Sequence, residues 1–149
     1  MLLYRNGPVG IVTKLNQVST IEILQSHVHM VEIPDVVHIM DQWIAVEPDQ
    51  LHYVVNTGMH GIMEGYRDPE FRGILNAADL FAPDGILLVL LARLRGYPIR
   101  KKNTGPGLLW EFSHIANEKA YSYFIYGDTE ETLQLLAIKL RQAFPHLII

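Results

Sequence analysis

The chain of 149 residues contains no cysteine, few charged residues and no long apolar run. Each of these features excludes some classes of protein. Without cysteine there is no disulfide framework, no thiolate metal site and no cysteine nucleophile, which is typical of a protein from a reducing cytoplasm. The longest apolar run, residues 86–92, is far shorter than the ~20 residues of a membrane-spanning helix. We therefore expect any contact with a membrane to be peripheral.

The charge balance is mild: charged residues make up 19% of the chain, hydrophobic residues 49%, and the formal net charge is −4. This composition predicts one soluble domain with a real core rather than a disordered chain. A mildly negative chain argues against broad nucleic-acid binding. The first residues lack a long apolar core followed by a small-residue cleavage site, so we expect no secretory signal.

Apolar residues recur alternately at strand and helix spacing along the chain, with proline and glycine between the segments. Strands are expected at residues 27–33, 51–55, 80–82 and 121–126 and from 147, whereas residues 18–24 fit a strand or a short helix. Helices are expected from Pro34 to before Pro48, at 58–65, after Asp68 with Phe71, Ile74 and Leu75 inward, and at 85–95, 108–119 and 130–144. This alternation predicts an α/β, Rossmann-like fold: a mostly parallel sheet with helices on both faces, in three layers.

The expected organisation is a poorly defined leader at residues 1–26 and one α/β domain at residues 27–149. The chain stops inside the apolar segment 147–149. A parallel strand at a bare edge would expose its backbone and its apolar side chains. We therefore expect the domain to be incomplete at its C-terminus, the alternative being a short edge strand that ends it.

Asp84 has the most informative position in the chain. It follows the buried-looking strand at residues 80–82 and precedes the apolar helix that begins at Gly85. In open α/β sheets, ligands bind at the edge formed by the carboxyl ends of the strands. A carboxylate at that edge can act as a base or as a ligand. The alternative is that Asp84 only caps the following helix, a common role for aspartate.

Asn56 and Thr57 end the preceding strand and are candidates for the same edge. Thr57 could contribute its hydroxyl to a site, or it could serve only as the N-cap of the next helix. His60 lies one turn into that helix and is a weaker candidate, because nothing in the sequence pairs it with a partner. His60 would lie near the same rim of the sheet, and the alternative is an ordinary surface histidine.

A basic loop, Arg100, Lys101 and Lys102, precedes Gly105. The flexibility of glycine lets backbone amides approach a phosphate, so this loop is a candidate diphosphate binder. The alternative is a solvated basic loop with no ligand.

No motif indicates a metal or a redox cofactor. The seven histidines do not fall at metal-ligand spacing, and no Asp-x-Asp pair of the kind that holds a divalent cation on a sugar nucleotide is present. The acidic stretch at residues 128–130 is better interpreted as the start of a helix. Gly127 is not followed by a GxGxxG motif, which argues against a nicotinamide or flavin enzyme. We therefore expect no cofactor.

Several short blocks stand in an order that is specific when they are taken together. They are Tyr53–Thr57, Arg67–Arg72, Asn76–Leu80, Pro83–Ile86, Ala92–Leu94, Gly105, Tyr123–Gly127 and Phe144–Pro145. With these blocks, the chain from about Val31 to Ile149 resembles the bacterial WecG/TagA/CpsF glycosyltransferase family. It departs from the family pattern at Gly107, where members often carry an aspartate.

The resemblance implies transfer of a sugar, of an N-acetylhexosamine type such as N-acetylmannosamine, from a UDP-sugar to a polyprenyl-diphosphate-linked acceptor. The reaction would invert the anomeric centre, need no metal and serve cell-surface polysaccharide or teichoic acid synthesis. It would take place in the cytoplasm at the inner face of the membrane, with self-association of the chain left open. The alternative is a truncated, non-catalytic remnant that acts as a binding module.

The resemblance also implies roles for the candidate residues. Asp84 matches the family position of the general base. Thr57 or Asn56 would orient the acceptor, and His60 would lie near it. Lys102, where members usually carry arginine, would lie near the diphosphate together with Arg100 and Gly105. Lysine keeps the charge of arginine but loses its two-pronged hydrogen bonding.

Overall fold

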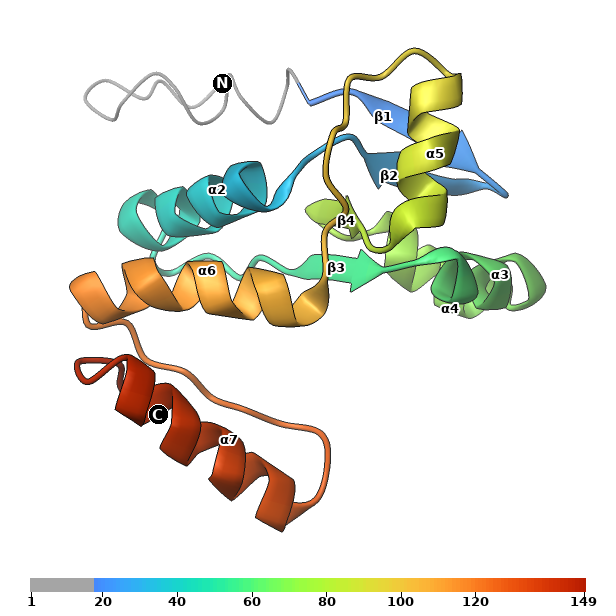
Figure 1. The fold of residues 1–149 in the computed structure, drawn as a ribbon. Helices are drawn as coiled ribbons and strands as arrows, with labels where there is room; N and C mark the ends of the chain where they lie inside the picture. The colour runs from blue at the N-terminus through green and yellow to red at the C-terminus, as the bar shows by residue number, and fades with distance from the viewer. Residues whose placement is uncertain (1–17) are drawn as a thin grey trace. The chain divides into compact units, whose positions relative to one another are not determined.

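The computed structural model describes residues 18–149 and divides into two compact units, one ending at Leu108 and one running from Leu109 to Ile149. The helices and strands are shown in Figure 1. In chain order they are β1 (Thr20–Ile23), β2 (Ser26–His29), α2 (Ile33–Val46), β3 (Val54–Thr57), α3 (Met59–Arg67), α4 (Pro69–Asn76), β4 (Leu80–Pro83), α5 (Ile86–Leu94), α6 (Gly105–Glu118) and α7 (Glu130–Ala143). Within residues 18–149, no helix is both long and apolar enough to cross a membrane.

The first unit contains a parallel strand pair that brings two strand ends to one edge. β3 and β4 run parallel in the register Val54↔Leu80 to Thr57↔Pro83. Just beyond β4, Asp84 forms a further parallel bridge with Asn103. Three chain segments therefore meet side by side at the carboxyl end of this small sheet, where open α/β sheets bind ligands.

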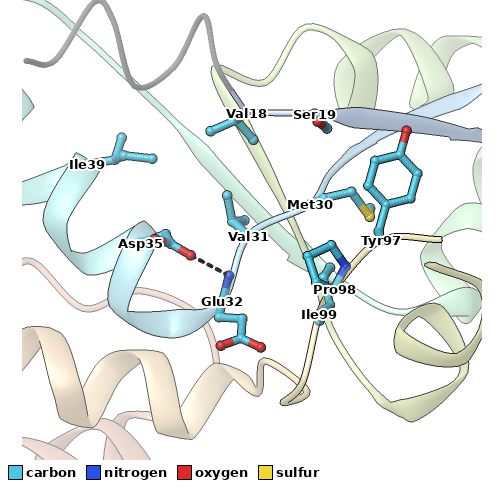
Figure 2. A pocket seen from close by; sticks show the side chains of 10 residues that line it. All are labelled: Val18, Ser19, Met30, Val31, Glu32, Asp35, Ile39, Tyr97, Pro98 and Ile99. Carbon is cyan, nitrogen blue, oxygen red and sulfur yellow. Dashed lines mark hydrogen bonds between the residues drawn. The ribbon is translucent and has the colours of Figure 1, made fainter. Parts of the chain in front are cut away.

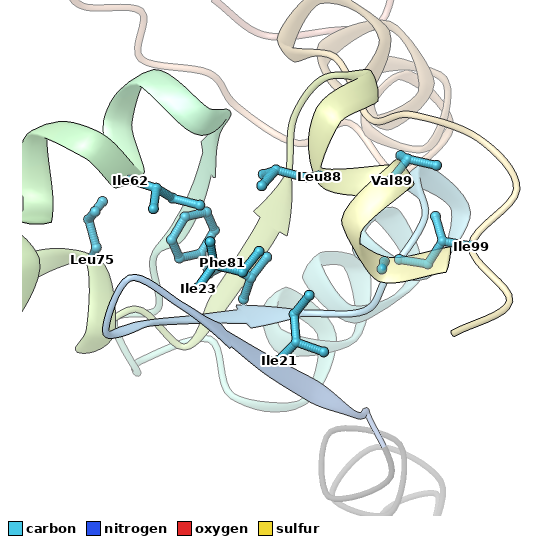
Figure 3. Close-up of a cluster of buried hydrophobic side chains, with 10 residues drawn as sticks. Ile21, Ile23, Ile62, Leu75, Phe81, Leu88, Val89 and Ile99 are labelled. Atoms are coloured by element: carbon cyan, nitrogen blue, oxygen red, sulfur yellow. The ribbon is translucent and has the colours of Figure 1, made fainter. Parts of the chain in front are cut away.

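β4 is buried on both sides because its residues alternate between two core clusters. Phe81 points to one side, where it packs with Ile62 of α3 and Leu75 of α4, as Figure 3 shows. Leu80 points to the other side and packs in the cluster that contains Trp43 of α2. Burying a side chain of this size is worth about 1.5–3 kcal/mol. These contacts hold β4, and hence Asp84 at its end, in place.

β1 and β2 form an antiparallel hairpin that joins β4 through side chains. The backbone N–H of Phe81 donates to Nδ1 of His29 over 2.9 Å. Burial lowers the pKa of His29, and the neighbouring charge of His27 lowers it further, which favours the neutral ring that can accept this bond. At the hairpin tip, Nδ2 of Asn76 donates to the carbonyl of Gln25 over 2.8 Å. The hairpin is thus attached to β4 by the His29 hydrogen bond and to α4 through Asn76, in addition to the apolar cluster that Ile21, Ile23 and Val28 share with Phe81.

The predicted α/β class is confirmed, and residues 18–24, which fitted two alternatives, form the strand β1. The described residues contain two two-stranded sheets, one antiparallel and one parallel, rather than one wide parallel sheet. The three-layer arrangement stays a prediction, as does the domain boundary after residue 26. The β1–β2 hairpin spans that boundary, and residues 1–17 of the expected leader lie outside the described part of the chain.

The strands expected at residues 121–126 and 147–149 are not formed in the second unit. The only pairing described there is one parallel bridge, Ser122↔Ile148. Side-chain exposure does alternate along this segment, with Phe124 92% and Tyr126 91% exposed. A strand also needs a hydrogen-bonding neighbour along its length, and this segment pairs only around Ser122.

Smaller corrections have local causes. Ile74 was expected on the inner face of α4 but is 53% exposed, because Leu75 takes the buried position. β3 begins at Val54 rather than at Leu51, which is 90% exposed. α6 begins at Gly105, before the expected residue 108, because the hydroxyl of Thr104 accepts a hydrogen bond from the third residue of the helix. The predicted N-cap of α4 is confirmed: the Asp68 carboxylate accepts from two backbone N–H groups of its first turn.

Candidate functional site

Asn56 and Asp84 meet at the carboxyl edge of the parallel pair. The two residues end adjacent strands, and Nδ2 of Asn56 donates to Oδ2 of Asp84 over 3.4 Å. Both side chains are partly exposed, so a ligand can reach them. The amide of Asn56 and the carboxylate of Asp84, both predicted to lie at strand ends, are therefore adjacent.

The Asp84 carboxylate is not used to cap the following helix. The N-cap of α5 is Gly85, which has φ of +85° and makes no side-chain cap bond. A φ in this region suits glycine, because a Cβ would be strained there. The capping alternative for Asp84 is therefore wrong, and its carboxylate remains available for chemistry.

Asn103 completes the edge and was missed by the sequence analysis. Its side chain is buried, and Nδ2 donates to the carbonyl of Val31 over 2.9 Å. Its backbone carbonyl accepts from the N–H of Gly85 over 3.2 Å, which fixes the turn after Asp84. The only sequence signal was an asparagine between a basic run and a glycine-rich helix start.

Two buried oxygens at this edge have no hydrogen-bond partner among residues 18–149: Oδ1 of Asn56 and Oδ1 of Asn103. Leaving a buried acceptor unpaired costs about 1–3 kcal/mol, so such atoms call for an explanation. Both atoms are covered by the surrounding residues, so a ligand could reach them only after neighbouring side chains move. The edge therefore holds unsatisfied acceptors beside the Asn56–Asp84 pair.

Thr57 faces the first turn of α3 and not an open cleft. A Cβ added at Gly61 would collide with the Oγ1 and Cγ2 atoms of Thr57, so the threonine side chain fills the space over that glycine. The N-cap of α3 is Gly58, so the capping alternative for Thr57 is also wrong. The Thr57 carbonyl accepts from the N–H of Asp84 over 3.1 Å, which gives the residue a positioning role at the edge.

The basic loop is fastened through its backbone, which leaves its side chains in solvent. The N–H groups of Arg100 and Lys101 both donate to Oε1 of Glu32, over 2.5 and 2.9 Å. The bond from Lys101 is the main reason that the pKa of Glu32 is lowered; burial opposes it, and Arg100 adds to it. The side chains of Arg100 and Lys102 are exposed. The loop thus holds the charged side chains of Arg100 and Lys102 near Asn103, and Glu32 is bonded to the backbone of the loop.

Of the remaining candidates, Gly105 lies at the edge and His60 does not join it. A Cβ at Gly105 would lie 3.6 Å from Nδ2 of Asn56, so the start of α6 is adjacent to the amide. His60 is exposed on α3, and among residues 18–149 no hydrogen bond or ion pair joins its side chain to Asn56 or Asp84. The structure brings together Asn56, Asp84 and Gly105, places Arg100 and Lys102 on the adjoining loop, and leaves His60 apart.

The sequence model of the Glycosyl transferase WecG/TagA/CpsF family matches residues 21–149. The chain belongs to this family. Two curated relatives carry the name N-acetylglucosaminyldiphosphoundecaprenol N-acetyl-beta-D-mannosaminyltransferase. The one from Bacillus spizizenii is 27% identical over 82 residues, 55% of this chain and 32% of the relative. The one from Bacillus subtilis is 24% identical over 81 residues, 54% of this chain and 32% of the relative. The chain thus spans about a third of the length of the curated relatives it matches.

Gly107 stands where the resemblance to the family led us to expect an aspartate. A Cβ there would lie 2.7 Å from Oγ1 of Thr104 and 3.1 Å from Cδ1 of Ile33. Contacts this short require the neighbouring atoms to move. An aspartate at this position would therefore require the Thr104 side chain to move, which would disturb the hydrogen bond that its hydroxyl accepts from the N–H of residue 107.

Two cavities of this family member lie outside the candidate site. The first, of about 430 Å³, lies between β2, the start of α2 and the segment Tyr97–Ile99, with Glu32 and Asp35 at its rim (Figure 2). The second, of about 540 Å³, is lined by residues of α2 and the segment before β3. Neither cavity is lined by Asn56 or Asp84. These two cavities are therefore separate from the Asn56–Asp84 pair.

Proposed function

We propose that this chain takes part in transfer of an N-acetylmannosamine-type sugar from a UDP-sugar to a polyprenyl-diphosphate-linked N-acetylglucosamine acceptor. The observation that carries the proposal is the hydrogen bond between Asn56 and Asp84 at the carboxyl edge of the parallel strands. The Asp84 carboxylate does not cap α5. The family membership and the relatives' names supply the substrate class.

Asp84 acts as the general base in this proposal. An acceptor hydroxyl oxygen attacks the anomeric carbon of the donor while its proton passes to the Asp84 carboxylate. The bond from that carbon to the diphosphate oxygen breaks, and UDP leaves with the electron pair. A single displacement at an α-linked donor gives the β configuration that the relatives' name contains. The product stays attached to the lipid.

Asn56 orients both partners in the proton transfer. Its Nδ2 holds one oxygen of Asp84, which directs the carboxylate toward the edge. Its Oδ1 is buried and unpaired in the unliganded chain, and in this proposal it accepts a hydrogen bond from a second hydroxyl or N–H group once a bound sugar displaces the covering side chains. One amide can thereby fix the acceptor relative to the base, and such positioning is a large part of catalytic power.

The leaving diphosphate needs positive charge, which the segment from Arg100 to Gly105 supplies. Arg100 and Lys102 are exposed cations, and Gly105 begins α6, whose N-terminal end carries a partial positive charge. All of them lie within a few residues of Asn103 at the edge. Negative charge developing on UDP would be stabilised there.

The test is acceptor-dependent UDP release by the purified chain, supplied with UDP-N-acetylmannosamine and a short-chain polyprenyl-diphosphate-N-acetylglucosamine. The key variant is Asp84→Asn, which keeps size and hydrogen bonding but cannot take a proton. A general base contributes roughly 10²–10⁴-fold, so release should fall by at least a hundredfold. Asp49→Asn is the matched control, because it makes the same change at an exposed turn residue and should leave the rate unaltered.

Normal release by folded Asp84→Asn would eliminate Asp84 as the base. The rival function, a binding module, predicts a different result: the wild-type chain would bind the lipid-linked acceptor in a direct titration and release no UDP. Circular dichroism of each variant excludes loss of folding as the cause.

A further inference from the structure

Helix α5 presents an unusually apolar surface to solvent. Its exposed apolar side chains are Ile86 (57%), Leu87 (48%), Leu90 (46%) and Leu94 (84%), which together are called the α5 apolar face. Successive helix residues are about 100° apart, so these four side chains fall within an arc of roughly 100°. The opposite side, with Leu88, Val89 and Ala92, is buried in the core. The helix is therefore apolar all round although only half of it is covered.

A basic segment runs along the same helix. Near the end of α5, Nε and Nη2 of Arg93 donate to the carbonyls of Ile99 and Arg100 over 2.8 and 2.6 Å. At its start, Gly85 donates to the carbonyl of Asn103. Helix residues 85–93 rise about 12 Å, and residues 99–103, which bend at Lys101, can span at most about 13 Å. The segment 99–103 therefore connects the end of α5 at Arg93 with its start at Gly85.

The cations of this segment lie beside the α5 apolar face. Around the helix axis Arg93 is only about 20° from Ile86, at one margin of the face. The bonds of Arg93 thus place the backbone at residues 99 and 100 on that side of the helix, and the side chains of Arg100, Lys101 and Lys102 are exposed.

Charge is strongly segregated toward this region. Arg93, Arg95, Arg100, Lys101 and Lys102 are five of the twelve lysines and arginines of the chain. No aspartate or glutamate occurs between Asp84 and Glu111, although the chain as a whole carries a net charge of −4. Glu32 is a carboxylate held against this segment, and the three cations Arg100, Lys101 and Lys102 outnumber it. An exposed apolar face next to such a segment, on a chain of net charge −4, is complementary to an anionic lipid surface.

We propose that the α5 apolar face and the adjoining 99–103 segment seat the protein on an anionic phospholipid membrane. The leucines enter the interface between head groups and acyl chains, and the cations lie at the phosphates. The inference rests on the proposed function in one respect, since an acceptor held on a lipid has to be met at the membrane. Gly85, at the start of α5, directly follows Asp84, so docking by this helix places the candidate base at the membrane surface.

The test is sedimentation of the full chain with vesicles of 3:1 phosphatidylcholine and phosphatidylglycerol, and with phosphatidylcholine alone, without any sugar substrate. Leu90→Gln with Leu94→Gln should weaken binding at least tenfold. The matched control, Leu51→Gln with Leu135→Gln, changes two exposed leucines elsewhere and should stay within twofold of wild type.

Lys101→Ala should weaken binding to the anionic vesicles about fivefold, and added salt should do the same. Leu94→Gln alone, at the most exposed position of the face, repeats the test without touching the core.

Equal vesicle binding by the wild type and the Leu90/Leu94 variant would overturn the proposal. A wild-type chain that binds neither kind of vesicle would also overturn it. A wild-type dimer in sedimentation equilibrium that the same variant converts to monomer, without vesicle binding, would assign the face to a second copy. Asp84→Asn should bind vesicles like wild type. A failed transfer assay and a failed membrane assay are therefore separate results.

Discussion

The hydrogen bond between His29 and Phe81 makes a definite prediction about stability. Nδ1 of His29 accepts the Phe81 N–H over 2.9 Å, and Phe81 lies fully buried in β4. His29→Ala leaves that N–H without its partner, which costs about 1–3 kcal/mol. His29→Asn offers an oxygen close to the position of Nδ1 and should recover most of the loss. Urea unfolding at pH 7.5 measures both differences.

The same bond should make stability depend on pH. Burial, together with the charge of His27, lowers the pKa of His29 in the folded chain, so the neutral ring is the favoured form. Its contribution is complete above the ordinary histidine pKa of about 6.5 and is lost as the pH falls through the folded-state pKa. One proton contributes at most about 1.4 kcal/mol per pH unit. Because the unfolded-state histidine is only half protonated at pH 6.5, wild type should lose up to about 1 kcal/mol more than His29→Asn between pH 6.5 and 5.5.

The control for this prediction is His27→Asn, which removes an exposed histidine of the same hairpin that holds no such bond. It should keep most of the pH dependence of the wild type. If His29→Asn and wild type lose equal stability on acidification, the dependence has another source. If His29→Ala costs less than about 0.5 kcal/mol, water replaces the ring at Phe81 and the bond carries little of the β2–β4 attachment.

Two further predictions concern packing and ionisation. Gly61→Ala should destabilise the chain by roughly 1–3 kcal/mol in urea unfolding, because the new methyl group meets the side chain of Thr57. Adding Thr57→Ala should restore most of the loss, and purely additive effects would contradict this contact. Burial raises the pKa of Tyr123, only partly offset by the hydrogen bond with Ser113. An ultraviolet titration, read as wild type minus Tyr123→Phe, should therefore show ionisation above pH 10, with the stability gained from the neutral ring lost as the pH rises through that range. Ionisation of Tyr123 at or below pH 10 would contradict the conclusion that burial raises its pKa.

The sequence was sufficient to find Asn56 and Asp84 because both follow short apolar runs. Such runs predict buried strands, and parallel strands end at a common edge. The pairing over 3.4 Å was thus foreseeable in kind, though not in distance. Asn103 was not foreseeable, because its partner Val31 is 72 positions away and no local periodicity connects them.

The failures of prediction have a common physical origin. Residues 121–126 have the alternation of a strand, yet alternation specifies only which side chains share a face. A strand exists only where hydrogen-bonding neighbours are present, and these are encoded elsewhere in the chain. Similarly, whether Asp84 or Gly85 caps α5 was decided by a backbone φ of +85°, which residue types alone leave open.

Asn103 also bears on the order in which the first unit folds. The β1–β2 hairpin and the α3–α4 pair join neighbours in sequence, so they can form while the rest of the chain is still unstructured. The contacts of Asn103 with Val31 and Gly85 can form only after long loops have closed, which is entropically costly and slow. The polar edge at Asp84 is therefore expected to assemble after those local pairs, and during synthesis it cannot close before residue 103 has left the ribosome. Substitutions at Asn103 should accelerate unfolding and leave the refolding rate nearly unchanged.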